Sequence, residues 1–260
     1  MSLASSLPTG GPGVVGTPAP APQAAVRRRR VVDAPTRMLH AIFALSFAGA
    51  WITGDSERWR WLHVTLGYTM AGALGFRLVY GLVGPQPTRW SALWRKIAAL
   101  PGWARGLLAR VEGRRPAALH RHGWLQGQAP LMGAAVGVLV AGALPLVLSG
   151  VAADQAWSGE WLEEIHEFLA QLMLIVVLAH IGLVGLFSML RRRNLAAPML
   201  TGYVSGVGPD LVRRNHAWLA ILLLVAAIAF AVWHWNAGAA GAGIAANAPG
   251  ITSPSDDDDD

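Results

Sequence analysis

The chain has 260 residues, of which 53% are hydrophobic and only 14% are charged, whereas about a quarter of the residues of a soluble domain are charged. This composition, with a mean hydropathy of +0.40, excludes an ordinary soluble protein. A net charge of +6 would suit a nucleic-acid partner, but the basic residues flank apolar segments, so no nucleic acid is expected. The absence of cysteine excludes disulfides, thiolate-held iron–sulfur clusters and covalent haem attachment.

Five apolar segments follow one another along the chain, each close to the roughly 20 helical residues that cross a bilayer. They lie at residues 37–54, 62–83, 129–151, 165–190 and 217–235. The first is short and begins at an arginine, so we expect its ends in the membrane interface. The sequence therefore predicts an all-α polytopic membrane protein, with a four-helix transmembrane bundle and a fifth transmembrane helix.

The remaining segments set the predicted organisation. Residues 1–32 are predicted to be a disordered leader, because most of them are Pro, Gly, Ala and Ser without periodicity. A cleaved signal peptide is the alternative, which the histidine inside the following apolar segment disfavours. The bundle is expected over 33–203, the additional helix over 204–236, and a disordered acidic tail over 237–260. Between the second and third segments, three tryptophans among Arg and Leu predict a helix lying in the interface.

Basic residues are distributed unevenly between the two sides of the membrane. Eighteen of the 21 Lys and Arg fall before or at the start of the first segment, between the second and third, or after the fourth. Only Arg58 and Arg60 fall on the other side, and Arg77 lies within the second segment. By the positive-inside rule the N-terminus is cytoplasmic and the C-terminal tail periplasmic.

Four histidines lie at matching depths in these segments. His40 is near the inner face and His63 near the outer face, while His166 and His180 lie at opposite ends of the fourth segment. An intramembrane imidazole is costly unless it is paired or bound to something. The depths predict two metal centres, one held by His40 with His180 and the other by His63 with His166, and haem is the expected cargo.

Helix geometry supports this pairing. The fourteen residues from His166 to His180 turn a helix back to within about 40° and advance it by about 21 Å. Both imidazoles therefore lie on one face of the fourth segment. Two bis-histidine haems stacked across the membrane require such an arrangement.

Several short motifs accompany the histidines. The first segment opens D-A-P-T-R-M-L-H over 33–40 and closes with Thr53-Gly54, and the second has H-V-T-L-G over 63–67 and then Gly84-Pro85. His166 is followed by Glu, His180 by Ile, and residues 193–202 contain R-N-L and T-G. Together these motifs resemble the bacterial cytochrome b561 group, which includes the cytochrome b subunits of nickel–iron hydrogenases. Two departures are Ala41, where the family usually has Trp, and Gln128, where it has His.

The resemblance implies a di-haem b-type cytochrome of the bacterial inner membrane, the electron-transfer subunit of an oxidoreductase. Its cofactors would be two non-covalent haem b groups, held as above, with ubiquinone or menaquinone as a further ligand. Expected partners are quinone, membrane lipid, and a periplasmic cytochrome c or a dehydrogenase or hydrogenase subunit. The acidic loop with Asp154, Glu160, Glu163 and Glu164 could dock a basic partner, although a solvated loop explains it equally.

Arg37 and Arg77 both lie at the inner level, where an arginine can bind haem propionates through charge-assisted hydrogen bonds. Snorkelling to lipid phosphate is the alternative for both.

Two other functions stay open. One is a superoxide:quinone oxidoreductase, with Arg58 and Arg60 attracting the anion, and the other is a non-redox transporter or assembly protein. His120, His122, His216 and His234 are interpreted as loop or interface residues.

Overall fold

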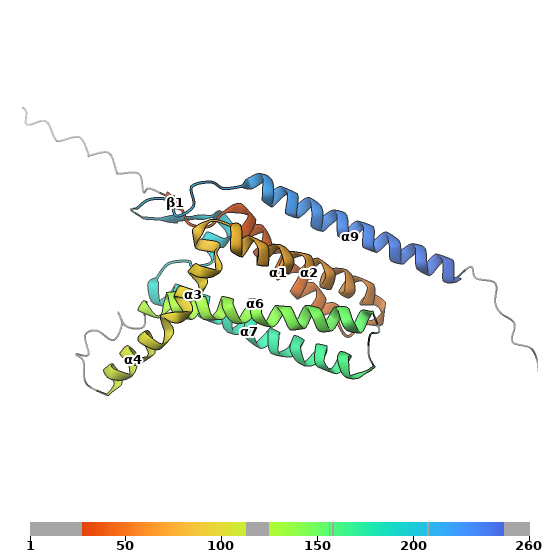
Figure 1. Ribbon diagram of the computed structural model, residues 1–260, viewed down its shortest axis with the longest axis horizontal. Helices are drawn as coiled ribbons and strands as arrows, with labels where there is room; N and C mark the ends of the chain where they lie inside the picture. Colours follow the sequence, from red (N-terminus) through yellow and green to blue (C-terminus); the bar gives the residue numbers. More distant parts are fainter. Residues whose placement is uncertain (1–27, 113–124, 156, 158, 207, 247–260) are drawn as a thin grey trace, which may run out of the picture.

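The computed structural model describes residues 28–112, 125–155, 157, 159–206 and 208–246 (Figure 1). Within this part of the chain, four helices are long and apolar enough to cross a membrane. They are α2 (Arg60–Val83), α6 (Gln128–Asp154), α7 (Trp161–Arg191) and α9 (Ala217–Ala246). A short 3₁₀ helix, η1 (Glu57–Trp59), directly precedes α2. The predicted all-α polytopic membrane fold is confirmed.

Helix α1 (Ala34–Thr53) corresponds to the first predicted segment but is not one of these four. The polar Arg37 and His40 stand in its first two turns and reduce its apolar character, so the fifth span is not confirmed by composition. Its 20 residues nevertheless form a helix about 30 Å long, which matches the hydrocarbon core of a bilayer. The buried Asp33 caps its first turn by accepting a hydrogen bond from the Thr36 amide at 3.3 Å.

The long helices alternate in direction and lie side by side (Figure 1). Helix α1 packs against α2, α2 against α6, and α6 against α7, while α9 lies along α1 and α2. We call the end of the bundle where α1 and α6 begin the strand end, and the end carrying η1 and the α6–α7 turn the η1 end. Shorter elements are η2 (Gln86–Thr88), α3 (Trp90–Ala98), α4 (Leu100–Val111) and α8 (Ala197–Thr201).

A small antiparallel sheet closes the strand end. Strand β1 (Arg28–Arg30) pairs with β2 (Tyr203–Ser205), and the Arg30 amide donates to the Asp210 carboxylate at 2.7 Å. The last residues of the predicted disordered leader are therefore ordered, because residues 28–30 form a strand. Residues 1–27 lie outside the described part of the chain.

At the other end of the sequence, α9 continues to Ala246, whereas the additional helix was expected to end at 236. The apolar composition of this segment extends into an Ala/Gly-rich stretch that holds few polar groups to stop a helix. Residues 247–260, with the aspartates of the predicted acidic tail, lie outside the described residues.

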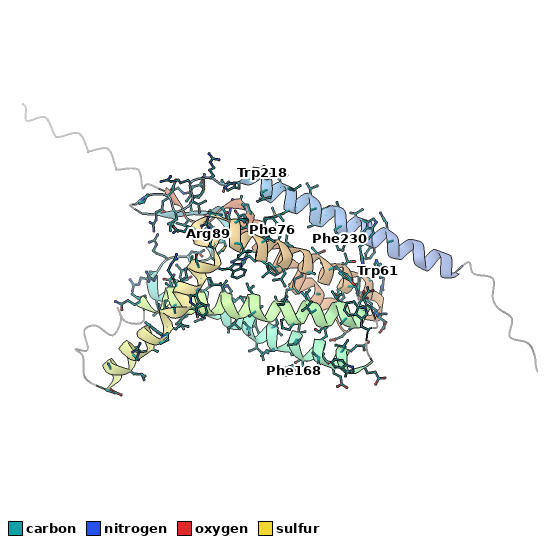
Figure 2. All side chains as sticks on the ribbon, in the orientation of Figure 1. Trp61, Phe76, Arg89, Phe168, Trp218 and Phe230 are labelled. Atoms are coloured by element: carbon teal, nitrogen blue, oxygen red, sulfur yellow. The ribbon has the colours of Figure 1, made fainter. Side chains whose placement is uncertain are left out.

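The core of the bundle is small, and much of the apolar surface faces outward. Met70, Leu74 and Leu146 are buried together between α2, α6 and α7. By contrast Phe168 and Trp218 are each 66% exposed, and Figure 2 shows both on the outside of the helices. In water such exposure of large apolar side chains would be unfavourable, whereas in a membrane it supplies the lipid-facing surface.

The segment predicted to form an interfacial helix is helical as α3 and α4, and Figure 1 shows α4 leading away from the bundle. Two glycines of α6 let α3 lie close. A Cβ built on Gly133 would come within 2.6 Å of the Lys96 Cβ, and one on Gly137 within 2.9 Å of the Ile97 Cδ1. The Trp94 indole is 69% exposed, as an aromatic side chain facing lipid would be.

Candidate metal centres

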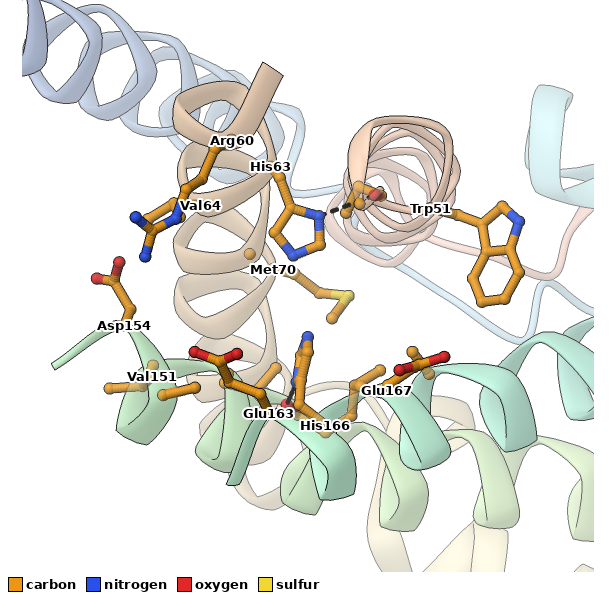
Figure 3. Close-up of a pocket in the computed structure, with 18 of the residues that line it drawn as sticks. Trp51, Arg60, His63, Val64, Met70, Val151, Asp154, Glu163, His166 and Glu167 are labelled. Carbon is orange, nitrogen blue, oxygen red and sulfur yellow. Dashed lines mark hydrogen bonds between the residues drawn. The ribbon is translucent and has the colours of Figure 1, made fainter. Parts of the chain in front are cut away.

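His63 of α2 and His166 of α7 face each other at the η1 end. Their ring centroids lie 6.1 Å apart, with the ring planes at 88°, and Figure 3 shows the two imidazoles pointing into one cavity. The cavity has a volume of about 620 Å³ and is bounded by α1, α2, α6 and α7. The two histidines that were paired from their depth in the sequence therefore face each other in the structure.

Both rings are oriented by main-chain carbonyls. His63 Nδ1 donates to the Ala50 carbonyl at 2.9 Å, which belongs to the last turn of α1, where carbonyls lack helical partners. His166 Nδ1 donates to the Leu146 carbonyl at 3.1 Å, with the Ser149 hydroxyl at the same distance. A carbonyl only accepts, so Nδ1 carries the proton and Nε2 is left as the metal-binding nitrogen.

The spacing of the two rings fits a single metal ion between them. An imidazole nitrogen binds a first-row metal at about 2 Å, which puts the centroids of two opposed ligand rings roughly 6 Å apart. The observed 6.1 Å agrees with this separation. The donor set of two neutral imidazoles also suits haem iron.

Two glycines make room around this pair. A Cβ built on Gly150 of α6 would lie 2.8 Å from the His166 Cε1, so only glycine leaves the ring in place. At Gly67, one turn along α2 from His63 and lining the cavity, an added Cβ would meet nothing within 4 Å. That open face of α2 is where a flat ring could lie.

His40 of α1 and His180 of α7 form the second pair, closer to the strand end. The two imidazoles are near enough to interact electrostatically. His180 Nδ1 is buried and has no hydrogen-bond partner among the described residues, and such an orphaned buried group usually has an explanation in an ion or ligand. The structure therefore brings together both predicted pairs, and it anchors the rings of His63 and His166 more completely.

Arg37 and Arg77, which were predicted to share one level of the membrane, both lie near the strand end. Arg37 donates from Nη1 to the Leu200 carbonyl at 2.8 Å, and the Arg77 guanidinium lies 4.6 Å from the centre of the Trp90 ring. Arg37 Nε and Arg77 Nη1 are buried donors without a partner in the described part of the chain. Buried hydrogen-bond donors without a partner, at the level of His40 and His180, would suit an anionic group bound beside these histidines.

Asp33 and Tyr80 form a buried contact that sequence reasoning missed. Asp33 is fully buried, and the Tyr80 hydroxyl donates to its second carboxylate oxygen. The carboxylate thus caps α1 and ties it to the end of α2. The signal for the cap is the Asp-x-Pro at the start of the first segment, but no sequence pattern indicates the tyrosine.

Acidic side chains predominate at the mouth of the cavity around His63 and His166. Figure 3 shows Asp154, Glu163 and Glu167 on its rim together with Arg60. Asp154 accepts a hydrogen bond from the Tyr68 hydroxyl at 2.9 Å. Arg58, the second basic candidate at this end, stacks over the neighbouring tryptophan and is not among the residues that line the cavity.

Two further histidines that the structure describes lie away from both pairs. His234 of α9 stacks on Trp61 of α2, with ring centroids 4.5 Å apart. His216 has a positive φ of 47° and stands at the start of α9. His120 and His122 lie outside the described residues. In the described part of the chain, no group of three or more metal-ligating side chains comes together.

The comparisons with known proteins agree with this site. The family model for prokaryotic cytochrome b561 matches residues 31–202, which include all four paired histidines. No curated protein and no solved structure matches the chain. With the paired imidazoles and the apolar helices, the match over most of the chain shows that this protein belongs to the prokaryotic cytochrome b561 family, whose members are b-type cytochromes of membrane electron transfer.

Proposed function

We propose that the protein is a di-haem cytochrome of the bacterial inner membrane that passes electrons between quinone, either ubiquinone or menaquinone, and a redox partner. The observation that carries the proposal is the 6.1 Å pairing of His63 with His166, with each Nδ1 already engaged by a carbonyl. Such a pair presents two Nε2 atoms to a metal and leaves neither ring free to turn.

His63 and His166 would hold one haem b, and His40 and His180 the other. Arg37 and Arg77 would hold the propionates of the second, because their unpartnered donors lie at its level. Iron supplies reversible one-electron chemistry, with a potential set by axial ligands and burial. The chain's contribution is to fix the ligand rings, to exclude water from them and to place the two pairs on one face of α7.

The spacing along α7 supports transfer between the two sites. His166 and His180 are fourteen residues apart on one helix, which is about 21 Å. A haem ring extends several ångströms from its iron, so the edges of the two groups would be closer than the ligands. No further centre between them is needed.

The distribution of charge supports the proposed orientation. Basic residues gather at the strand end, including β1 and the last turn of α3, whereas Asp55, Glu57 and Glu163 line the cavity at the η1 end. By the positive-inside rule the strand end is cytoplasmic and the η1 end periplasmic. The acidic rim favours a basic electron-transfer partner, such as a periplasmic cytochrome c, by electrostatic steering.

The same rim disfavours the superoxide alternative. An anionic substrate would approach Asp154, Glu163 and Glu167, and Arg60 is the one Lys or Arg among the described residues that line the cavity. The family match also favours electron transfer over a non-redox transporter or assembly protein.

Haem content and quinol reduction test the proposal. Pyridine haemochrome analysis of the purified protein should give about two non-covalent haems per chain, with low-spin spectra. Quinol added to membranes should reduce both haems, and His63→Ala should prevent electrons from reaching an outer acceptor while the inner haem is still reduced. One haem or none per chain would contradict the two-centre assignment, and two haems that no quinol reduces would contradict the quinone assignment alone.

A further inference from the structure

A second cavity lies at the strand end, away from both histidine pairs. Its volume is about 430 Å³, within the range of small-ligand sites. Residues of η2, of α3 and of the first turn of α6 line it, together with Leu211, which precedes α9. Because α6, which is long and apolar enough to cross a membrane, begins at the border of this cavity, the cavity lies at the level where lipid headgroups meet water.

Its charged lining is entirely basic. Arg95 and Lys96, in the last turn of α3, both line the cavity, and no Asp or Glu does among the described residues. Neither side chain forms an ion pair with any residue that the structure describes. Two neighbouring cations without a counter-charge favour an anion between them.

Packing holds the stem of one of these two exposed side chains in place. The Lys96 Cβ lies so close to α6 that a side chain at Gly133 would collide with it, and the stem of Lys96 is thereby fixed at the helix contact. Ala129 and Pro130, in the first turn of α6, also line the cavity, and that helix has no side-chain cap. The positive end of the α6 helix dipole adds to the positive potential there.

Apart from the amide of Gln86, the rest of the lining is apolar. Ala92, Ala99 and Leu211 form part of it, and they suit the glycerol and upper acyl region of a lipid better than a fully hydrated ion. We propose that this cavity binds the phosphate of an anionic membrane phospholipid. The proposal rests on the fold and the charges of the strand end, and it does not depend on the haem assignment.

Native mass spectrometry of the full-length protein in detergent tests it, with phosphatidylglycerol or phosphatidylcholine of the same acyl chains added. The wild type should bind the first phosphatidylglycerol much more tightly than phosphatidylcholine. The R95Q/K96Q variant should lose affinity for phosphatidylglycerol by about 30-fold, because each basic residue at an anionic lipid surface contributes about a factor of five. The R105Q/R214Q variant removes two exposed arginines that do not line the cavity and should bind like the wild type.

Two further arms make the outcome decisive. The R95K/K96R variant keeps both charges and should keep the lipid preference, and gel filtration checks that each variant is folded. Thermal stabilisation by inorganic phosphate alone, equal to that by phosphatidylglycerol, would assign the cavity to a free phosphate and overturn the lipid proposal. Equal binding of both lipids by the wild type, or tight phosphatidylglycerol binding retained by R95Q/K96Q, would also overturn it.

Discussion

Gly150 of α6 lies directly against the imidazole of His166 on α7. A Cβ at position 150 would stand 2.8 Å from the ring Cε1 and 3.1 Å from Nδ1, which is closer than side-chain carbons approach without displacement. The glycine therefore fixes where the ring can lie, and with it the hydrogen bond from Nδ1 to the Leu146 carbonyl.

The first prediction concerns this glycine. Gly150→Ala should push the His166 ring from its position and lower the content or the low-spin character of the outer haem, while the inner haem is unchanged. Gly182→Ala is the matched control, because an added Cβ there meets nothing within 4 Å. Optical and electron paramagnetic resonance spectra of the two variants provide the measurement, and an unchanged outer haem in Gly150→Ala would contradict the assigned geometry.

The second prediction concerns the pairing. His40→Ala and His180→Ala should deplete the same haem, and His63→Ala and His166→Ala the other, because each pair shares one metal. Loss of one ligand leaves a five-coordinate iron and a high-spin signal, or an empty site. Redox titration of each variant separates the two haems. Should His40→Ala resemble His63→Ala rather than His180→Ala, the pairing is wrong.

The contact of the histidine pairs could be predicted from sequence because it depends on two regular quantities, the helix rise and the alternation of spans. Depth placed His63 opposite His166, and the 14-residue interval placed His180 on the same face of α7. Both depend on local helix geometry, which an apolar segment determines.

The supporting contacts could not be predicted in this way. The carbonyl of Ala50 accepts from His63, and Tyr80 meets Asp33, only because separate helices pack in one particular rotation and register. His234 illustrates the same limit. Its position between two tryptophans predicts an interface residue, but no sequence pattern indicates that its ring stacks on Trp61 of α2. Such pairs depend on tertiary packing, and a single sequence holds no periodic signal for them.

The third prediction follows from the buried Asp33. Asp33→Ala removes the cap of α1 and leaves the Tyr80 hydroxyl without its acceptor, so it should lower the free energy of unfolding by about 2–3 kcal/mol. Tyr80→Phe keeps the cap and should cost only about 1 kcal/mol. Unfolding in mixed detergent measures both. Asp55→Ala, an exposed carboxylate at the η1 end, is the control, and an equal loss there would contradict a specific role for Asp33.

The fourth prediction concerns the contact between α9 and α2. The His234 ring stacks on Trp61, its Nδ1 lies 2.8 Å from the Thr65 hydroxyl, and the Trp61 indole donates to the His234 carbonyl at 3.1 Å. An aromatic pair contributes about 0.5–1.5 kcal/mol, so His234→Ala should speed amide exchange near residue 234 by about two- to tenfold. Trp235→Ala, whose ring is 46% exposed, should change the exchange little. Equal effects of both variants would show that α9 is held by lipid rather than by this contact.

The fifth prediction decides whether α1 crosses the membrane. If it does, five crossings put the two ends of the chain on opposite sides. The distribution of basic residues then places the N-terminus in the cytoplasm and the end of the chain in the periplasm. An alkaline phosphatase fused after Asp260 should be active, and a green fluorescent protein fused there should be dark, with the reverse for fusions before Met1. If only the four helices of sufficient hydropathy cross, both ends lie on one side. Fusions at the two ends would then report the same compartment, and His40 could not stand inside the membrane opposite His180.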